Sequence, residues 1–545
     1  MYDIIIKNGT VVDGTGKDGY SADVGILGEK IADIGDLSEY EAKVVIDATD
    51  LIVSPGFIDI HTHTDTGLLI EPRAESKIRQ GVTTEIGGNC GGSVGPLRGE
   101  VLSDAQKWMD EHGIVGNRER LGGFLDILED RKIGVNYATF VGNATIRSAV
   151  IGPVNRPPTE EELNEMRQEV AQAMEEGALG LSTGLIYTPS MFADTDEIVE
   201  LAKVAANYGG YYASHIRGES GTLLTALSEA VEIGKRADIP VQIAHVKASG
   251  RNVWGKAEEA LAIIDKARSE GINVTGDRYP YLAGSTGLKN VLPVWAREGT
   301  KEEQLQRLKD NETRTEIKEF INSHPFNDTR RDEILICIDG ATIRDWSQRR
   351  NLEPTEMVCQ LLIENNMDVG MCTFTMCQED TDIILSHPFI MIASDSSAKA
   401  PYGELSEGKP HPRTYGTFPR VLQEYSRERQ LFKMSEAVRK MTSMPAQKIG
   451  LTDRGVLKKG NYADLCIFDY ENVKDNATYA EPHQYPTGIE YVLVNGQIAV
   501  NKSEAVHEVT TPLPPFIKGE PFGRGTAERS EHTGVLAGKV LRHNA

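Results

Sequence analysis

The chain has 545 residues, 39% of them hydrophobic, and a formal net charge of -23. This length and composition exclude a disordered chain and leave room for one barrel-sized domain with a smaller companion. The acidic balance argues against nucleic acid or an anionic membrane as a partner, because both would repel the protein.

The chain is expected to be cytoplasmic. Its N-terminus, MYDIIIKNGT, lacks the basic region, apolar core and cleavage site of a signal peptide, and no apolar run approaches the roughly 20 residues that cross a bilayer. Six cysteines are scattered without the spacing of a disulfide framework. We therefore expect reduced thiols, with Cys90 free to bind a metal. A homo-oligomer is left open.

Short strands joined by turns are predicted at both ends of the chain. They include residues 2–7 and 23–27 near the start, and 463–469 and 489–494 near the end. Because chain termini often lie close together, residues 1–55 and 450–500 are expected to form one β-sandwich domain. Residues 501–545 are a C-terminal tail that could wrap the barrel or mediate oligomer contacts.

The stretch SPGFIDIHTHTD, residues 54–65, predicts a buried strand that ends at two histidines. Side chains alternate along a strand, so His61 and His63 project from one face and can bind one metal ion. An isolated His-x-His is more often part of a turn. The ligands supplied later in the chain favour the metal site.

Residues 56–449 alternate predicted strands and helices. The eight predicted strands are 54–61, 82–86, 136–141, 178–182, 211–215, 241–246, 272–277 and 391–395, and the helices include 159–176, 194–208, 221–237 and 257–270. Thr159 and Glu162 form a capping-box signature. Repeated βα units predict an α/β fold, a TIM-type (β/α)8 barrel with its chemistry at the carboxyl ends of the strands. The long gap before the last strand predicts an insertion at about 285–345, with a helix at 301–322, which we interpret as a lid.

Side chains that bind metals follow several of these strands. They are His61, His63, Cys90, His215, His245 and Asp395. A single histidine after a strand is usually an ordinary polar residue, but six such side chains at strand ends argue against coincidence. Imidazole, thiolate and carboxylate suit Zn²⁺, so the pattern predicts a zinc site at the mouth of the barrel.

The motifs around these residues are distinctive. They are GGNC, STGLIYTP (182–189), SHIRGE (214–219), AHVK (244–247), GDRYPYLAGST (276–286), SD (394–395) and HPRTYGTFPRVL (411–422). Over nearly the whole chain they resemble the D-aminoacylase, or N-acyl-D-amino-acid deacylase, family of metal-dependent amidohydrolases. The resemblance implies a TIM-type barrel with a β-sandwich, and hydrolysis of N-acyl-D-amino acids to a carboxylate and a free D-amino acid.

The resemblance also implies roles for individual residues. Cys90, His215 and His245 match a tightly held zinc, and His61, His63 and Asp395 match a second, weaker site that Cys90 also faces. Many related amidohydrolases bridge two metals with a lysine from the fourth strand. Here that strand reads LGLS at 179–182, without lysine, which favours the cysteine-ligated branch over the hydantoinase branch. Asn143 stands where many relatives have histidine.

Asp395 is the expected proton carrier of the reaction. Zinc lowers the pKa of its bound water to roughly 7 and polarises the amide carbonyl. Asp395 would take the proton of the attacking water and pass it to the leaving amine. The ordinary alternative for Asp395 is a helix N-cap before Ser396 and Ser397.

Substrate contacts are predicted from the same resemblance. The candidates for the α-carboxylate are Lys247, Tyr187, Tyr279 or Tyr281, and Ser285. Their ordinary alternatives are a solvent-facing loop for the lysine and barrel packing for the tyrosines. Lys289 follows Ser285 by one helical turn and could reach the acidic side chain of a D-Glu or D-Asp derivative, or lie on the surface of the lid.

Three residues near the ligands are left with weaker interpretations. Arg217 and Glu219 could orient His215 or form a surface ion pair. Arg413 is expected to line the cleft, and spacing assigns it no role.

Two other functions stay open from the sequence. One is an amidohydrolase acting on a cyclic amide, which the missing lysine and the Cys90 ligand disfavour. The other is a non-catalytic scaffold, which would be expected to have lost ligands.

Overall fold

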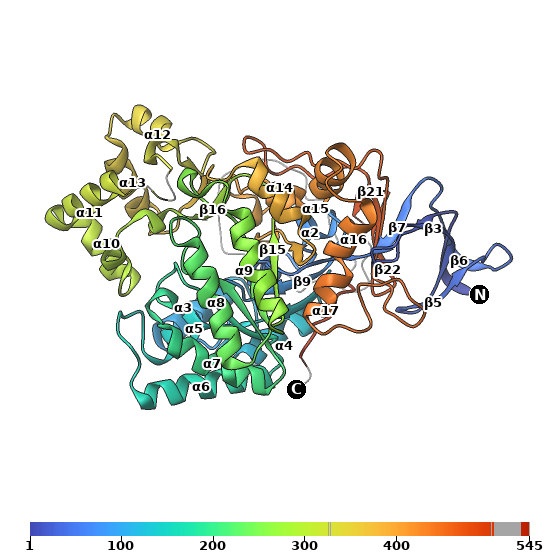
Figure 1. Cartoon of the computed structure of the whole chain (residues 1–545), viewed down its shortest axis with the longest axis horizontal. Helices are drawn as coiled ribbons and strands as arrows, with labels where there is room; N and C mark the ends of the chain where they lie inside the picture. The colour runs from blue at the N-terminus through green and yellow to red at the C-terminus, as the bar shows by residue number, and fades with distance from the viewer. Residues whose placement is uncertain (325, 327–328, 503, 506–535, 544–545) are drawn as a thin grey trace.

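Eight parallel strands form the barrel (Figure 1). The computed structural model describes residues 1–324, 326, 329–502, 504–505 and 536–543. The strands are β8 (Phe57–Asp59), β9 (Val82–Gly87), β10 (Asn136–Thr139) continued by β11 (Val141–Gly142), β12 (Gly180–Gly184), β13 (Tyr211–His215), β14 (Val241–Ile243), β15 (Val274–Arg278) and β19 (Ile390–Ile392). The last strand returns to the first, where Asp395 N donates to His61 O at 2.9 Å and Thr62 pairs in parallel with Ser396. The predicted barrel is therefore confirmed.

Helices cover the outside of the barrel. Figure 1 shows α6 (Glu160–Glu175), α7 (Thr195–Asn207), α8 (Leu223–Ala237) and α9 (Ala257–Ser269) following one another along its flank. The predicted capping box is present, because Glu162 N donates to the Thr159 hydroxyl and Thr159 N donates to the Glu162 carboxylate. Each helix turns its apolar residues toward the strands, so the main hydrophobic core lies between these two layers.

Both chain ends contribute to a second, β-rich body. One sheet has the order β5-β4-β1-β6, with β1 (Tyr2–Lys7), β4 (Asp23–Leu27), β5 (Lys30–Gly35) and β6 (Ala42–Asp47). The other has the order β23-β22-β21-β20-β7-β2-β3, with β2 (Thr10–Val11), β3 (Tyr20–Ser21), β7 (Ile52–Pro55), β20 (Leu465–Phe468), β21 (Ile489–Val494), β22 (Gln497–Asn501) and β23 (Glu504–Ala505). Their facing side chains, including Ile4, Ile26, Leu465 and Leu493, form a core of their own.

The single strand expected at 54–61 is two strands with different partners. β7 pairs with β20 in the sandwich, whereas β8 pairs with β9 in the barrel. Gly56 lies between them, and a Cβ there would come within 2.3 Å of the Thr83 side chain, so the crossing requires glycine. The strand itself ends at Asp59, and both histidines lie beyond it.

An inserted unit separates β15 from β19. Its sheet has the order β16-β18-β17, with β16 (Gly284–Gly287), β17 (Leu335–Ile336) and β18 (Gly370–Thr373), so its strands reach beyond the predicted end near 345. Its helices are α10 (Lys301–Lys309), α11 (Asn311–Ser323), α12 (Ile343–Arg350) and α13 (Pro354–Glu364). Where one helix was expected at 301–322 there are two, because Asp310 ends α10 and caps α11 by accepting from Thr313 N.

Only part of the predicted tail is described. Residues 506–535 lie outside the described residues, while 536–543 run beside the barrel, where Gly538 N donates to Ile133 O at 2.7 Å. None of the described helices combines the length and apolar composition needed to span a bilayer.

Candidate metal centre

The six predicted ligands meet at the carboxyl ends of the barrel strands. Their donor atoms form two groups, each within 4.8 Å: His61, His63, Cys90 and Asp395 in one, and Cys90, His215 and His245 in the other. Cys90 belongs to both groups. The structure therefore brings together side chains that lie up to 334 positions apart, from His61 to Asp395.

The distances around the thiol suit a metal ion. Cys90 Sγ lies 3.3 Å from His61 Nε2, 3.7 Å from His215 Nδ1 and 3.8 Å from His245 Nε2. Bonds of about 2.1 Å to nitrogen and 2.3 Å to sulfur in a tetrahedral site separate the donor atoms by about 3.4–3.7 Å. One thiolate with several imidazoles is a zinc-type donor set, so these residues fit zinc.

Three of the ligands have a strained backbone. Cys90, His245 and Asp395 have φ values of +54°, +35° and +50°, a region that residues other than glycine rarely occupy. Each lies two or three residues beyond the end of a barrel strand, in a bend that brings its side chain to the other ligands. Such strain is typical of functional sites held in place by the surrounding fold.

The turn that carries Cys90 is held in place by β12, the fourth strand of the barrel. Ser182, in β12, accepts from Gly91 N at 3.1 Å and donates to Gly88 O. A Cβ at Gly184 would lie 2.1 Å from the Cys90 carbonyl oxygen. The fourth strand therefore supplies no metal ligand but positions the cysteine.

Electrostatics favour the thiolate form of Cys90. Burial raises the pKa of the thiol, but His61, together with hydrogen bonds from His215 and His245, outweighs burial and holds this pKa well below its usual value. A thiolate is the form that binds metal.

Two carboxylates, of Asp277 and Glu219, contact the histidines at the ring nitrogens that face away from Cys90. Asp277, at the end of β15, has Oδ1 3.2 Å from His61 Nδ1 and accepts from His245 N at 2.8 Å. Glu219 has Oε1 3.0 Å from His245 Nδ1 and 3.8 Å from His215 Nε2. Carboxylates at the far nitrogen fix the orientation of metal-binding histidines. The sequence indicated Glu219 only weakly, and Asp277 was missed although it lies near the end of a predicted strand.

Asp395 lies between the histidines and an arginine. Its Oδ1 is 3.0 Å from His63 Nε2 and 3.4 Å from His61 Nε2, and its Oδ2 is 2.8 Å from Arg413 Nη1. Burial raises the pKa of Asp395, but Arg413 and the histidines outweigh it and hold this pKa well below the usual range. Asp395 is therefore ionised at neutral pH. It does not serve as an N-cap here, because no helix begins at Ser396.

The predicted substrate contacts surround this centre in different ways. The Tyr187 ring lies 5.0 Å from that of His215, and Tyr279 lies under the Arg413 guanidinium at 4.6 Å. Lys247 is buried and ion-paired with Glu219. Its charge is therefore already balanced.

The other three predicted substrate contacts are Ser285, Tyr281 and Lys289. Ser285 O accepts from Arg413 Nη2 at 3.4 Å. The Tyr281 hydroxyl donates to Asp475 at 2.8 Å, so its polar end is already occupied. Lys289 is exposed. Asn143 is buried and accepts from the Ser190 hydroxyl at 2.8 Å.

The sequence also matches a known protein family. The model of the Amidohydrolase family matches residues 44–292 and 404–500. The chain belongs to this family. The D-aminoacylase of Alcaligenes xylosoxydans xylosoxydans is 37% identical over 91% of the chain and 94% of that protein. The N-acyl-D-glutamate deacylase of the same organism is 35% identical over 91% and 93%.

A solved member of the family shares the whole fold. The N-acyl-D-glutamate deacylase of Bordetella bronchiseptica, solved with zinc and a phosphonate inhibitor, is 30% identical and covers 99% of both chains with a TM-score of 0.78. This amidohydrolase therefore has the barrel and β domain of its relatives.

Proposed function

We propose that this amidohydrolase hydrolyses the amide bond of N-acyl-D-amino acids, giving a carboxylate and a free D-amino acid. Full-length similarity to D-aminoacylase and to N-acyl-D-glutamate deacylase supports this activity. The observation that carries the proposal is the convergence of Cys90 with four histidines and Asp395 at one end of the barrel. Imidazole, thiolate and carboxylate are ligands that bind catalytic zinc.

The proposed ligands divide between two zinc ions. Cys90, His215 and His245 would hold a tightly bound ion, and His61, His63 and Asp395 a weaker second one. When bound, zinc supplies a water of lowered pKa and polarises the amide carbonyl.

Asp395 is proposed as general base and then general acid. Its ionised carboxylate accepts the proton of the attacking water and passes it to the leaving nitrogen, which is a poor leaving group unless protonated. Arg413 at 2.8 Å keeps the carboxylate ionised and fixes its orientation.

Substrate contacts follow from the groups around the centre. Tyr187, Tyr279 and Ser285 are proposed to orient the α-carboxylate. The ion-paired Lys247 and Arg413 lie over the Tyr279 ring beside them.

A stereochemical assay tests the proposal. The zinc-loaded enzyme should release free amino acid from N-acetyl-D-amino acids and not from the L-enantiomers, and chelation should abolish the release. Hydrolysis of hydantoins without hydrolysis of N-acyl-D-amino acids would refute the proposal and favour the cyclic-amide reading.

A further inference from the structure

Two cysteines of the inserted unit lie in contact with each other. Cys337 directly follows β17 and Cys372 lies in β18, and their Sγ atoms are 3.8 Å apart. Cys372 is buried whereas Cys337 is half-buried, so small molecules reach the pair from the side of Cys337. The sulfur atoms of a disulfide lie about 2.05 Å apart, so a small shift of either residue would allow the bond.

The backbone at Cys337 can make that shift. Its N–H donates to Gly370 O at 2.9 Å, and the chain then leaves the strand in a turn. A Cβ at Gly370 would lie 3.3 Å from Cys337 Sγ, so the glycine gives the thiol room to lie across β18 toward Cys372. Turn residues move more readily than residues in the middle of a sheet.

The thiol pair adjoins Arg413, the partner of Asp395. Cys372 pairs across the sheet with Ser285, whose carbonyl oxygen accepts from Arg413 Nη2 at 3.4 Å. Hydrogen bonding between the two thiols raises the pKa of Cys337 and lowers that of Cys372, and the nearby charge of Arg413 acts to lower both. The pair is therefore connected through β16 to the arginine that orients Asp395.

A second connection runs through the segment that carries Arg413. Cys337 O accepts from Lys409 N at 2.6 Å. Two residues further on, His411 Nδ1 accepts from Arg413 N at 3.0 Å. A shift of Cys337 toward β18 would therefore pull on residues 409–413 as well as on the inserted sheet.

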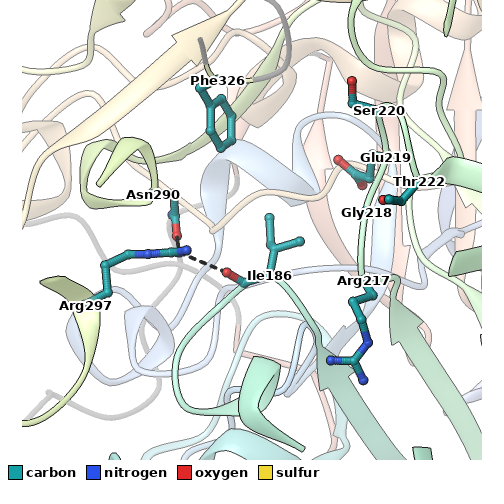
Figure 2. Close-up of a pocket in the computed structure, with 9 residues that line it drawn as sticks. All are labelled: Ile186, Arg217, Gly218, Glu219, Ser220, Thr222, Asn290, Arg297 and Phe326. Carbon is teal, nitrogen blue, oxygen red and sulfur yellow. Dashed lines mark hydrogen bonds between the residues drawn. The ribbon is translucent and has the colours of Figure 1, made fainter. Parts of the chain in front are cut away.

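The inserted unit also borders the space next to the metal centre. A cavity of about 210 Å³ has Asn290 and Arg297 of this unit in its wall, and Asn290 lies in η3 (Leu288–Val291), directly after β16. Figure 2 shows these two side chains on one side of the cavity and Glu219 on the other. Glu219 Oε1 lies 3.0 Å from Nδ1 of the ligand His245. Movement of the inserted sheet therefore reaches the surroundings of the metal ligands.

We infer that Cys337 and Cys372 are a modification site, which a peroxide oxidises to a reversible disulfide that slows the enzyme by displacing Arg413 from Asp395. Peroxide first converts one thiol to a sulfenic acid, as its O–O bond breaks and one water leaves. The second thiol attacks that sulfur, the S–S bond forms, and a second water leaves. Two thiols and one hydrogen peroxide thus give one disulfide and two waters. Only the effect on the rate rests on the proposed function.

Peroxide treatment of the zinc-loaded enzyme tests the inference. Peptide mapping should find residues 337 and 372 in one linked peptide, with two hydrogens fewer than the separate peptides. The rate on N-acetyl-D-amino acids should fall by about 10- to 100-fold, because a misplacement of about 1 Å at a catalytic site can cost that much. Dithiothreitol should break the link and restore the rate.

Two variants serve as controls. Cys337→Ser cannot form the bond and should keep its rate after peroxide; because it retains Cys90, it also separates the pair from oxidation of the metal-binding thiol. Cys377→Ser is the matched control. Cys377 is half-buried in the same stretch of chain and faces Asp380 Oδ2 at 3.2 Å, so this variant should respond to peroxide as the wild type does.

Several results would overturn the inference. They are the absence of a linked peptide in the wild type, a linked peptide without a fall in rate, and an equal fall in Cys337→Ser. Failure of the untreated wild type on every N-acyl-D-amino acid would instead overturn the proposed function and, with it, the effect on the rate. The linked peptide would still decide whether the two cysteines form the disulfide.

Discussion

At the scale of single residues, the geometry assigns distinct tasks to Asp395 and to the ligands around it. Asp395 Oδ1 faces two histidines while Oδ2 faces Arg413. Asp395→Asn keeps the shape but removes the proton acceptor. We expect kcat to fall by about 10²- to 10⁴-fold while zinc bound at Cys90, His215 and His245 is retained, as measured by metal analysis. Full activity in this variant would refute the role of Asp395.

Glu219 is expected to affect zinc affinity rather than substrate binding. Its carboxylate faces the outer nitrogens of His245 and His215. Glu219→Gln should weaken zinc binding by about 10- to 100-fold in a chelator competition. Glu229→Gln is the matched control, since Glu229 binds Arg217 of the same loop and touches no ligand. Unchanged zinc affinity in Glu219→Gln would show that this carboxylate serves only to balance Lys247.

The residues of the centre were predictable to different degrees. The convergence of the six proposed ligands could be predicted because each follows an apolar strand, and barrel geometry brings strand ends together. Asp277, Glu219 and Arg413 contact the ligands from other segments, and their partners depend on side-chain directions that spacing does not contain.

At the scale of elements, α2 (Glu75–Ile78) connects the first and last barrel strands. Lys77 is completely buried and donates to Asp59 at 2.9 Å, to the Ser394 hydroxyl at 2.6 Å and to Ser396 O at 2.9 Å. These residues flank His61 and Asp395. Lys77 therefore fixes the junction at which the barrel closes and beside which His61 and Asp395, two members of one ligand group, lie.

Removing this lysine should destabilise the protein. Lys77→Met leaves Asp59 without its cation, so we expect the free energy of unfolding to fall by about 3–5 kcal/mol in denaturant titrations. The exposed Lys107→Met is the control and should change it by less than about 0.5 kcal/mol. Equal stability of the two variants would mean that the buried ion pair contributes nothing.

A second buried lysine makes stability depend on pH. Lys440, in α16 (Met434–Met441), is fully buried and donates to His387 O and Ile390 O; burial lowers its pKa from 10.5 to about 7. Between these values the unfolded chain binds more protons than the folded one. The stabilising effect of raising the pH is therefore present from about 7 to 10.5.

Replacing Lys440 should remove this dependence. The stability of the wild type relative to Lys440→Met should rise with pH by up to about 1.4 kcal/mol per unit in that window, followed by denaturant titration. Lys433→Met, at an exposed lysine preceding the same helix, should show no such trend. A difference between wild type and Lys440→Met that is the same at all pH values would contradict the expectation.

At the scale of the whole molecule, the barrel and the sandwich followed from patterns that the sequence contains. Eight apolar runs separated by helical stretches predicted the ring of strands, and short strands at both ends predicted the second body. The division of 54–61 into β7 and β8 was not predictable, because Gly56 interrupts one continuous apolar run without changing its pattern. The inserted sheet was missed for a similar reason, since its strands are only two to four residues long.

X-ray absorption at the zinc edge tests the central claim, that these segments converge on one metal centre. Both ligand groups share Cys90, so any zinc bound there should show one sulfur neighbour at about 2.3 Å among nitrogen and oxygen neighbours at about 2.0–2.1 Å. Cys90→Ser should lose the sulfur signal. A zinc shell of nitrogen and oxygen alone in the wild type, or a sulfur signal that persists in Cys90→Ser, would contradict the proposed centre.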